Sequence, residues 1–217
     1  MTDPYHPPLN TFVLTAAEAR AIKAALLTSK PWDDADKVLG HAAILANLKK
    51  RLRTLHLDRH CNTCCYCKTN LHGAGHFMID REHVLPKQKF KALSYAVVNI
   101  SISCKRCNME YKGNHLDFII DQALAGTSSD NGANYLLVHP NYDRWTDHLR
   151  RSSRQVDENV LVKYTVRSAD KGRYTYDYFD LKQMEIDSFD KAQGLKGGFS
   201  ALATRVRQIA KFFGQLR

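Results

Sequence analysis

The chain has no long apolar run and is short of acidic residues relative to basic ones. Nowhere among its 217 residues does an uninterrupted apolar segment approach the roughly 18 residues that cross a membrane. The N-terminal Met1-Thr2-Asp3-Pro4 lacks the basic-then-apolar pattern of a secretory signal, and no internal repeat or long low-complexity tract is present. We therefore expect a cytoplasmic protein with no membrane partner, of a length that suits one compact domain.

The shortage of acidic residues leaves a strongly basic chain. It holds 32 Lys and Arg against 22 Asp and Glu, for a formal net charge of +10 and a sequence pI near 9.3. Such a balance favours a polyanionic partner, of which nucleic acid is the commonest. Ribosomal proteins and proteins that bind membrane surfaces share it, so the charge indicates nucleic-acid binding only together with a motif.

Six cysteines in a cytosolic chain are unlike a disulfide framework, because cytosolic thiols stay reduced. Four of them form two Cys-x-x-Cys pairs, Cys64/Cys67 and Cys104/Cys107. Each pair can present two thiolates from one tight turn, so two pairs supply the four soft ligands of a tetrahedral zinc site. The alternatives are a plain zinc ribbon or a redox-active pair. Cys61 and Cys65 remain as free thiols, although Cys61 could take the place of Cys64.

Three stretches organise the chain: a helical segment at 1–58, a cysteine-rich core at 59–126 and a C-terminal part at 127–217. In the first, Thr15 and Glu18 fit a capping box at the start of a helix. Apolar residues then recur at helical spacing and extend the prediction to about residue 57: Leu45, Leu48, Leu52 and Leu55. We expect the three stretches to form one compact unit.

Strands and further helices are predicted in the other two stretches. The apolar segments 77–80 and 98–103 are typical of strands, and 115–125 is typical of a helix. The segments 160–166 and 174–179 alternate apolar and polar residues around Asp170-Lys171-Gly172, which predicts a β-hairpin. An amphipathic helix is expected from about 202 to 216. The expected fold class is therefore α+β.

An acidic residue and a histidine stand together at Glu82-His83, between the two cysteine pairs. Imidazole titrates near neutrality and can take a proton from water, while a carboxylate can hold a hard cation that stabilises charge on a phosphate. This combination suits the hydrolysis of a phosphodiester. An isolated pair of this kind is a common surface feature, so the surrounding motifs decide its meaning.

The surrounding motifs resemble those of the HNH endonucleases of the His-Me finger superfamily. The resemblance is carried, in order along the chain, by Cys64-Cys65-Tyr66-Cys67, Glu82-His83-Val84-Leu85-Pro86, Asn99-Ile100-Ser101-Ile102-Ser103-Cys104, and Cys104-Lys105-Arg106-Cys107-Asn108 followed by Lys112-Gly113. It covers about a quarter of the chain. It implies a ββα-metal core, in which a β-hairpin and a following helix surround a catalytic metal and a structural zinc joins the hairpin base to the helix.

The same resemblance implies roles for individual residues. His83 would be the general base toward water, and Glu82 and Asn108 would be ligands of a catalytic Mg²⁺ or Mn²⁺ ion. Asn99 would hold the loop that orients the histidine. The family more often carries Asp where this chain has Glu82, so Asp80, two residues upstream on the same strand face, is the reserve ligand.

Basic residues beside the second cysteine pair could bind phosphates that flank the cleaved one: Lys105, Arg106 and Lys112. The expected partner is nucleic acid, DNA first. RNA and tRNA stay open as substrates because phosphate contacts carry little base information. A different class of function also stays open, a zinc-stabilised nucleic-acid-binding or structural subunit without activity.

A further stretch, 136–149, resembles the segment after the second cysteine pair in HNH proteins of bacterial anti-phage operons. That branch includes the HNH subunits of Septu-type and related retron defence systems, which act beside an SMC-like ATPase. The resemblance therefore implies a nuclease effector of antiviral defence with an ATPase partner. His139 and His148 within this stretch are expected to be structural, because no thiolate or carboxylate cluster accompanies them at ligand spacing.

Overall fold

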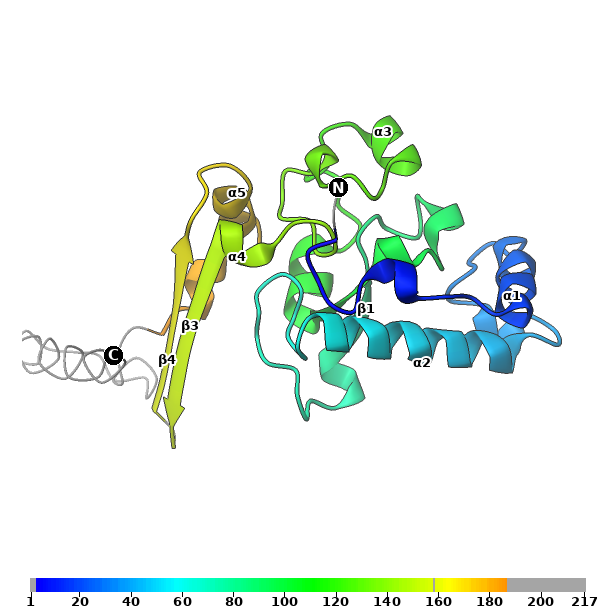
Figure 1. Cartoon of the computed structure of the whole chain (residues 1–217), viewed down its shortest axis with the longest axis horizontal. Coiled ribbons are helices and arrows are strands. Elements are labelled where there is room, and N and C mark those ends of the chain that lie inside the picture. Colours follow the sequence, from blue (N-terminus) through cyan, green and yellow to red (C-terminus); the bar gives the residue numbers. More distant parts are fainter. Residues whose placement is uncertain (1–2, 158, 187–217) are drawn as a thin grey trace, which may run out of the picture. The chain divides into compact units, whose positions relative to one another are not determined.

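The computed structural model describes residues 3–157 and 159–186 (Figure 1). The chain is mixed α+β, with two antiparallel sheets of two strands each in this part. It divides into two compact units, which within the described residues are 3–150 with 166–179, and 151–157 with 159–165 and 180–186. The expected segments 1–58 and 59–126 thus belong to one unit. No helix of the described residues is long and apolar enough to cross a membrane.

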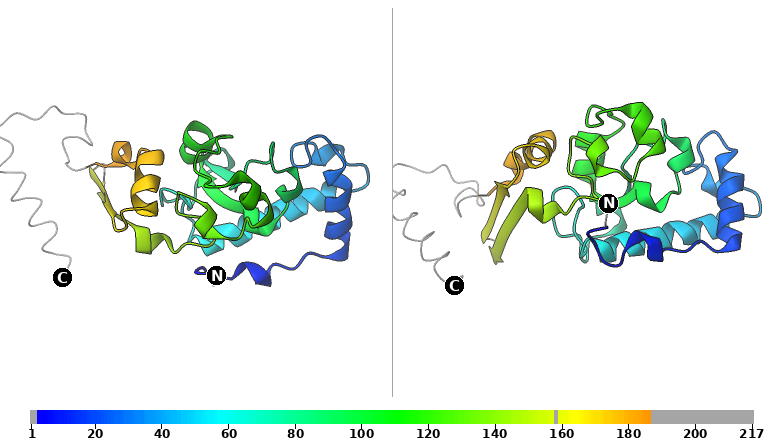
Figure 2. Two further views of the ribbon diagram at one scale, coloured as in Figure 1. Left: turned by 90° about the horizontal axis from the view of Figure 1, so that it is seen from above. Right: turned by 45° about the horizontal axis from the view of Figure 1, so that its top comes forward.

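Two helices form the N-terminal part of the first unit. Helix α1 (Ala16–Leu26) begins with the predicted capping box, in which Glu18 N donates to Thr15 Oγ1 (3.1 Å) and Thr15 N donates to Glu18 Oε2 (2.8 Å). Helix α2 (Ala42–Arg59) follows after a short 3₁₀ turn. The predicted helical stretch is therefore two helices, and Figure 2 shows them meeting at an angle.

The apolar stripe of α2 carries the core of this unit. Leu45, Leu48 and Leu52 are fully buried, as their helical spacing predicted. They belong to a cluster with residues from α1, from the segment before α2, from the connection between the two strands of the following sheet and from its second strand: Ala21, Ala25, Trp32, Ala35, Val38, Tyr95 and Ile100. Because α2 packs on this sheet, it fixes the sheet against the loop that holds Trp32.

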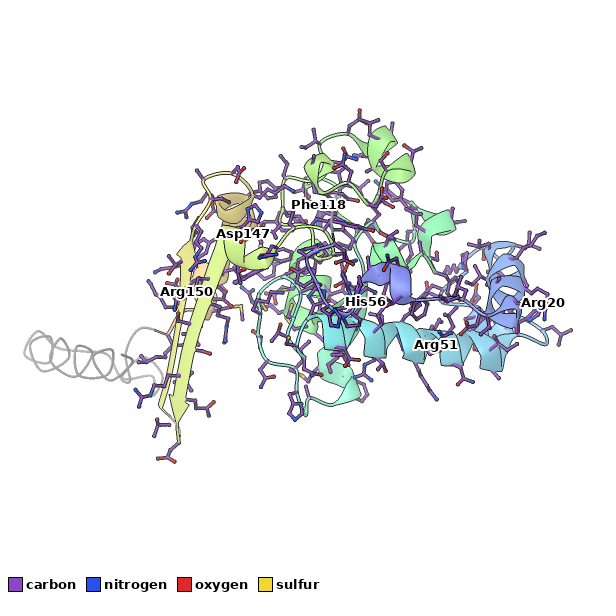
Figure 3. All side chains as sticks on the ribbon, viewed as in Figure 1. Arg20, Arg51, His56, Phe118, Asp147 and Arg150 are labelled. Carbon is purple, nitrogen blue, oxygen red and sulfur yellow. The ribbon has the colours of Figure 1, made fainter. Side chains whose placement is uncertain are left out.

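The N-terminal segment lies along the other side of α2 (Figure 2). Asp3 forms a two-pronged ion pair with the buried Arg59, with nitrogen–oxygen distances of 2.8 and 2.9 Å. At the middle of α2, Arg51, which Figure 3 labels, pairs with Glu18 of the capping box. These contacts tie the middle and the C-terminal end of α2 to the segment that precedes it in the chain.

The first sheet pairs β1 (Ile79–His83) with β2 (Ile100–Cys104). Its register sets Ile79 opposite Cys104 and His83 opposite Ile100. β1 starts two residues later than predicted and includes Glu82 and His83. A π-helix (Arg106–Lys112) follows β2 directly, and Gly113 N donates to Asn108 O across five residues (2.7 Å).

The helix predicted at 115–125 is wrong for residues 115–121 and correct for 122–125. α3 begins only at Gln122 and ends at Thr127. Asp121 is its N-cap, with an extended backbone and a side chain that accepts hydrogen bonds from Ala123 N and Leu124 N. A capping side chain of this kind fixes the start of a helix.

The strand predicted at 160–166 is present, but the predicted hairpin partner at 174–179 is wrong. β3 (Leu149–Val156) pairs with β4 (Asn159–Val166), whereas 174–179 contributes to helix α5 (Lys171–Tyr178). The short helix α4 (Trp145–His148) precedes β3. The amphipathic helix predicted at 202–216 lies outside the described residues.

The position of Gly172 explains why 174–179, predicted as a strand, contributes to helix α5. A Cβ added there would lie 2.3 Å from the carbonyl oxygen of His148, so Gly172 allows α5 to approach the end of α4. Tyr174 and Tyr178 stack one helical turn apart, with ring centroids 5.6 Å apart. The segment Asp170-Lys171-Gly172 thus begins a helix and is not the turn of a hairpin, and the glycine serves helix packing.

Candidate functional site

The four paired cysteines come together at one point in the first unit. Their sulfur atoms all lie within 4.8 Å of one another and all four residues are buried. Zinc–sulfur bonds of about 2.3 Å at tetrahedral corners place sulfurs about 3.8 Å apart. The Sγ atoms of Cys67 and Cys104 are 3.8 Å apart, and all six cysteines are free thiols. The cluster could therefore hold a metal ion such as zinc, as the spacing of the pairs predicted.

Three pieces of backbone supply these sulfurs. Cys64 and Cys67 lie in a tight turn closed by Lys68 N, which donates to Cys64 O (3.0 Å). Cys104 ends β2 and Cys107 lies in the π-helix, so the cluster joins the turn, the sheet and the helix. Of the two remaining cysteines, Cys61 is exposed and Cys65 is buried outside the cluster.

A cavity of about 420 Å³ lies beside β1 and the π-helix. Its lining includes five of the residues that the sequence singled out, together with Trp32: Asp80, His83, Lys105, Asn108 and Lys112. Carboxylate, imidazole, amide and ammonium groups thus share one opening. Glu82 and Arg106 are absent from the lining.

His83 is held firmly in the wall of this cavity. Its Nε2 lies 3.0 Å from the carbonyl oxygen of Ser94, which can only accept a hydrogen bond. In neutral His83 the proton is therefore on Nε2, and Nδ1 carries the lone pair. The ring meets Trp32 edge to face, with centroids 4.6 Å apart. Burial lowers the pKa of His83 to about 4, so the ring is neutral at pH 7 and can accept a proton.

Asn99 fastens the loop that follows His83. Its Oδ1 accepts from Leu85 N (2.8 Å) and its Nδ2 donates to Leu85 O (3.1 Å). Its backbone oxygen also accepts from Val84 N (2.9 Å). The arrangement matches the loop-holding role that the resemblance implied, and Asn99 is buried away from the cavity lining.

Asp80 and Asn108 form the polar floor of the cavity. Asn108 Nδ2 donates to Asp80 Oδ2 (2.9 Å), which leaves Asn108 Oδ1 available as a ligand. The ammonium of Lys105 lies 2.7 Å from Asp80 Oδ1. Carboxylate and amide oxygens are the donors that Mg²⁺ and Mn²⁺ prefer, so this pair fits a hard cation.

Glu82 occupies a different environment from the one the sequence implied. It is fully buried, its Oε1 accepts from Tyr66 OH (3.0 Å), and the same oxygen lies 2.8 Å from Lys112 Nζ. Burial raises the pKa of Glu82, while the neighbouring Lys112 ammonium opposes the shift. The structure thus brings Asp80, His83 and Asn108 into one cavity lining and leaves Glu82 out of it, buried and paired with Lys112.

The three basic residues predicted to bind phosphate are placed differently from one another. Lys105 and Lys112 line the cavity, each paired with an acidic residue of β1. Arg106 instead donates to the carbonyl oxygen of Phe179 (2.7 Å) and to the hydroxyl of Tyr111 (2.9 Å). These bonds give Arg106 a structural role in the packing of the first unit.

A second cavity of about 440 Å³ adjoins the first and shares Trp32, Lys87 and Gln88 with it. Lys87 pairs with Asp33 at its edge. Lys30 and Lys91 also line it and form no ion pair with any described residue, so the second cavity is positively charged.

Sequence reasoning assigned no role to Trp32, Ser94 or Tyr66, although all three contact the site. Trp32 and Ser94 reach His83 through tertiary packing, which has no local signal in the sequence. Tyr66 could have been noticed, because it lies inside the first cysteine pair. No family model, curated protein or solved structure matches the chain.

Proposed function

We propose that this protein hydrolyses phosphodiester bonds of nucleic acid, with DNA as the leading substrate, by the chemistry of HNH endonucleases of the ββα-metal type. The observation that carries the proposal is the convergence of His83, Asp80 and Asn108 on one cavity with lysines in its wall. A general base, oxygen ligands for a cation and positive charge are the groups that this hydrolysis requires.

His83 is the proposed general base. The Ser94 carbonyl fixes its tautomer and the edge-to-face contact with Trp32 fixes its ring plane, so the lone pair on Nδ1 has a defined direction. A base held in this way loses little entropy when it takes a proton from water.

Asp80 and Asn108 are the proposed ligands of a Mg²⁺ or Mn²⁺ ion, in preference to Glu82 with Asn108. When bound, the ion supplies Lewis-acid stabilisation of the phosphate and of the leaving oxygen. Asp80 and Asn108 line the cavity, whereas Glu82 is absent from its lining and its carboxylate is buried against Lys112. Binding would require Lys105 to leave Asp80, which a half-exposed lysine side chain can do at little cost.

Substrate binding is supported by the charge around the two cavities. Lys105 and Lys112 lie beside the proposed catalytic groups, and Lys30 and Lys91 line the adjoining cavity. Phosphates on either side of the cleaved one could contact these ammonium groups. The resemblance to nuclease subunits of anti-phage operons extends the proposal to a defence effector that acts with an SMC-like ATPase.

One observation favours the second candidate function, an inactive zinc-stabilised binding module. The ammonium of Lys105 lies 2.7 Å from the Asp80 carboxylate and so competes with the cation for it. A module of this kind would retain the cysteine cluster and the basic surface, but would not need His83.

A cleavage assay separates the two functions. Purified protein is incubated with supercoiled plasmid or with labelled RNA, in Mg²⁺, Mn²⁺ or EDTA, and wild type is compared with His83→Ala and with His72→Ala. His72 is an exposed histidine outside the cavity, so its variant controls for loss of an imidazole. We expect cleavage in metal that is lost in EDTA and in His83→Ala alone.

Two results would count against the nuclease. Cleavage that persists in His83→Ala would show that His83 is not the general base. Retention of zinc and of nucleic-acid binding with no cleavage in either metal would favour the inactive module. The substrate that is cut also decides between DNA and RNA.

A further inference from the structure

The pair formed by Glu82 and Lys112 is unusual because both side chains are almost completely buried, at 0% and 1% exposure. Taking two charges out of water is costly, and a buried pair repays the cost only with close geometry and further hydrogen bonds. Here the geometry is close, at 2.8 Å, and the further hydrogen bond comes from Tyr66 OH. Such a group calls for an explanation beyond general stability.

Lys112 connects this buried pair to the proposed catalytic cavity. Lys112 is one of the residues that line the cavity, with His83 and Asn108. Glu82 and Asp80 lie on the same face of β1, and Lys112 and Asn108, four residues apart in the π-helix, face them. Glu82 therefore restrains the ammonium of Lys112, a residue that lines the same cavity as the groups that would act on phosphate.

Tyr66 connects the same pair to the cysteine cluster. It lies between Cys65 and Cys67, in the turn that supplies two of the four clustered sulfurs. Its ring stacks on Phe179 with centroids 4.5 Å apart, and its carbonyl oxygen accepts from Trp145 Nε1 (2.9 Å). The position of its hydroxyl is thus set by the turn and by packing.

We propose that Tyr66 is a positioning residue, which acts through Glu82 to fix Lys112 in the cavity wall and so couples the cysteine cluster to the catalytic centre. In this arrangement Glu82 is the counter-ion of Lys112. The inference rests on the phosphodiesterase activity proposed above. It predicts that the cluster contributes to catalysis by more than holding the fold together.

The test removes the Tyr66 hydroxyl while keeping the ring. Tyr66→Phe is compared with Tyr135→Phe, a matched control in which an equally buried tyrosine loses a hydroxyl that donates to Ser129 O (3.1 Å). Both variants are also made in a Lys112→Met background. If Lys112→Met does not fold, Glu82→Gln replaces it as the background, because it removes the same ion pair with a side chain of the same size.

For Tyr66→Phe we expect kcat for plasmid cleavage to fall about tenfold with KM within about twofold, because a displaced ammonium stabilises developing charge less well. Zinc content should stay at one per chain. Tyr135→Phe should keep its kcat, and Tyr66→Phe should have no further effect once Lys112 is replaced.

Two results would overturn the inference. Tyr66→Phe could lower kcat by the same factor with and without Lys112, or Tyr135→Phe could match it. If the wild type cleaves nothing, urea unfolding of the same variants still tests whether Tyr66 and Lys112 are coupled. If the shift in urea midpoint of the double variant differs from the sum of the shifts of Tyr66→Phe and Lys112→Met, the two residues are coupled. If it equals that sum, the coupling is excluded.

Discussion

The side chains of Asp80 and Asn108 are joined by a hydrogen bond of 2.9 Å from Nδ2 to Oδ2, across the gap between β1 and the π-helix. The bond orients the amide so that its oxygen is free for another partner. A strand carboxylate and a helix amide thereby present oxygen atoms to one cavity. This pair, more than the Glu82-His83 dipeptide, defines the proposed cation site.

Replacing either acidic residue of β1 by its amide should show whether Asp80 or Glu82 is the metal ligand. We expect Asp80→Asn to weaken Mn²⁺ binding and to lower cleavage about 100-fold or more, because a charged ligand is lost. Glu82→Gln should keep Mn²⁺ affinity within a few-fold. Isothermal titration with Mn²⁺ and plasmid cleavage measure the two effects. If Glu82→Gln weakened Mn²⁺ binding and cleavage more than Asp80→Asn did, Glu82 and not Asp80 would be the ligand.

If the cysteine cluster holds a structural zinc, removing that metal should unfold much of the first unit. The cluster joins the Cys64–Cys67 turn, β2 and the π-helix, and binding of a structural zinc supplies free energy on the order of 10 kcal/mol, comparable with the stability of a whole domain. We expect Cys107→Ser to lose zinc and the cooperative melting transition, as followed by circular dichroism and elemental analysis. The exposed Cys61→Ser should keep both, and equal damage from it would contradict the assignment.

Replacing one partner of the buried ion pair should lower the free energy of unfolding more than replacing both partners. Lys112→Met leaves the carboxylate of Glu82 buried without its counter-ion, and we expect a loss of about 3–5 kcal/mol in the free energy of unfolding. Adding Glu82→Gln should recover most of that loss, because no uncompensated charge remains. Urea unfolding of the single and double variants measures this. A double variant as unstable as the sum of the singles would show that the pair is not coupled.

Local patterns in the sequence were sufficient where the interaction itself is local. The capping box of Thr15 and Glu18 spans four residues, and its hydrogen bonds are present. The cysteine spacing likewise predicted the sulfur cluster, since each pair supplies its ligands from one turn or strand end. The capping box and the two sulfurs within each cysteine pair are local, whereas the meeting of the two pairs, with Cys67 and Cys104 separated by 37 residues, depends on the fold.

Tertiary contacts decided what the sequence could not. Strand alternation placed Asp80 and Glu82 on one face, but which of them reaches the cavity depends on Lys112, 30 residues after Glu82, and on Tyr66, 16 residues before it. The tautomer of His83 depends on the carbonyl of Ser94. No residue type or spacing indicates such contacts in advance.

The close packing of α5 gives a direct test of the corrected C-terminal part. Gly172→Ala would place a Cβ 2.3 Å from the carbonyl oxygen of His148, so the helix must shift, and we expect a loss of about 1–3 kcal/mol. Gly75→Ala is the matched control, because a Cβ there meets nothing within 4 Å. Thermal melting of both variants checks this. A hairpin turn at Gly172 would predict little loss from packing.

Buried histidines should make the fold sensitive to acid. Burial lowers the pKa of His56 to about 3, with a smaller effect of Arg59, and lowers that of His139 to about 3, with Asp143 opposing and Lys171 adding to the shift. In the unfolded chain both titrate near 6.5. Between pH 6.5 and about 3 the unfolded state therefore binds protons that the folded state does not.

The sign follows from that difference in bound protons. The contribution of these histidines to stability is complete above pH 6.5 and declines as the pH falls, by about 1.4 kcal/mol per pH unit for each histidine. Urea unfolding at pH 7.5, 6.5, 5.5 and 4.5 measures the slope. His56→Leu fills the space without a titrating group. It should reduce the slope of the free energy of unfolding between pH 6 and 4 by the contribution of one histidine, about 1.4 kcal/mol per pH unit. A slope unchanged by this substitution would mean that His56 is already protonated, or solvated, in the folded protein.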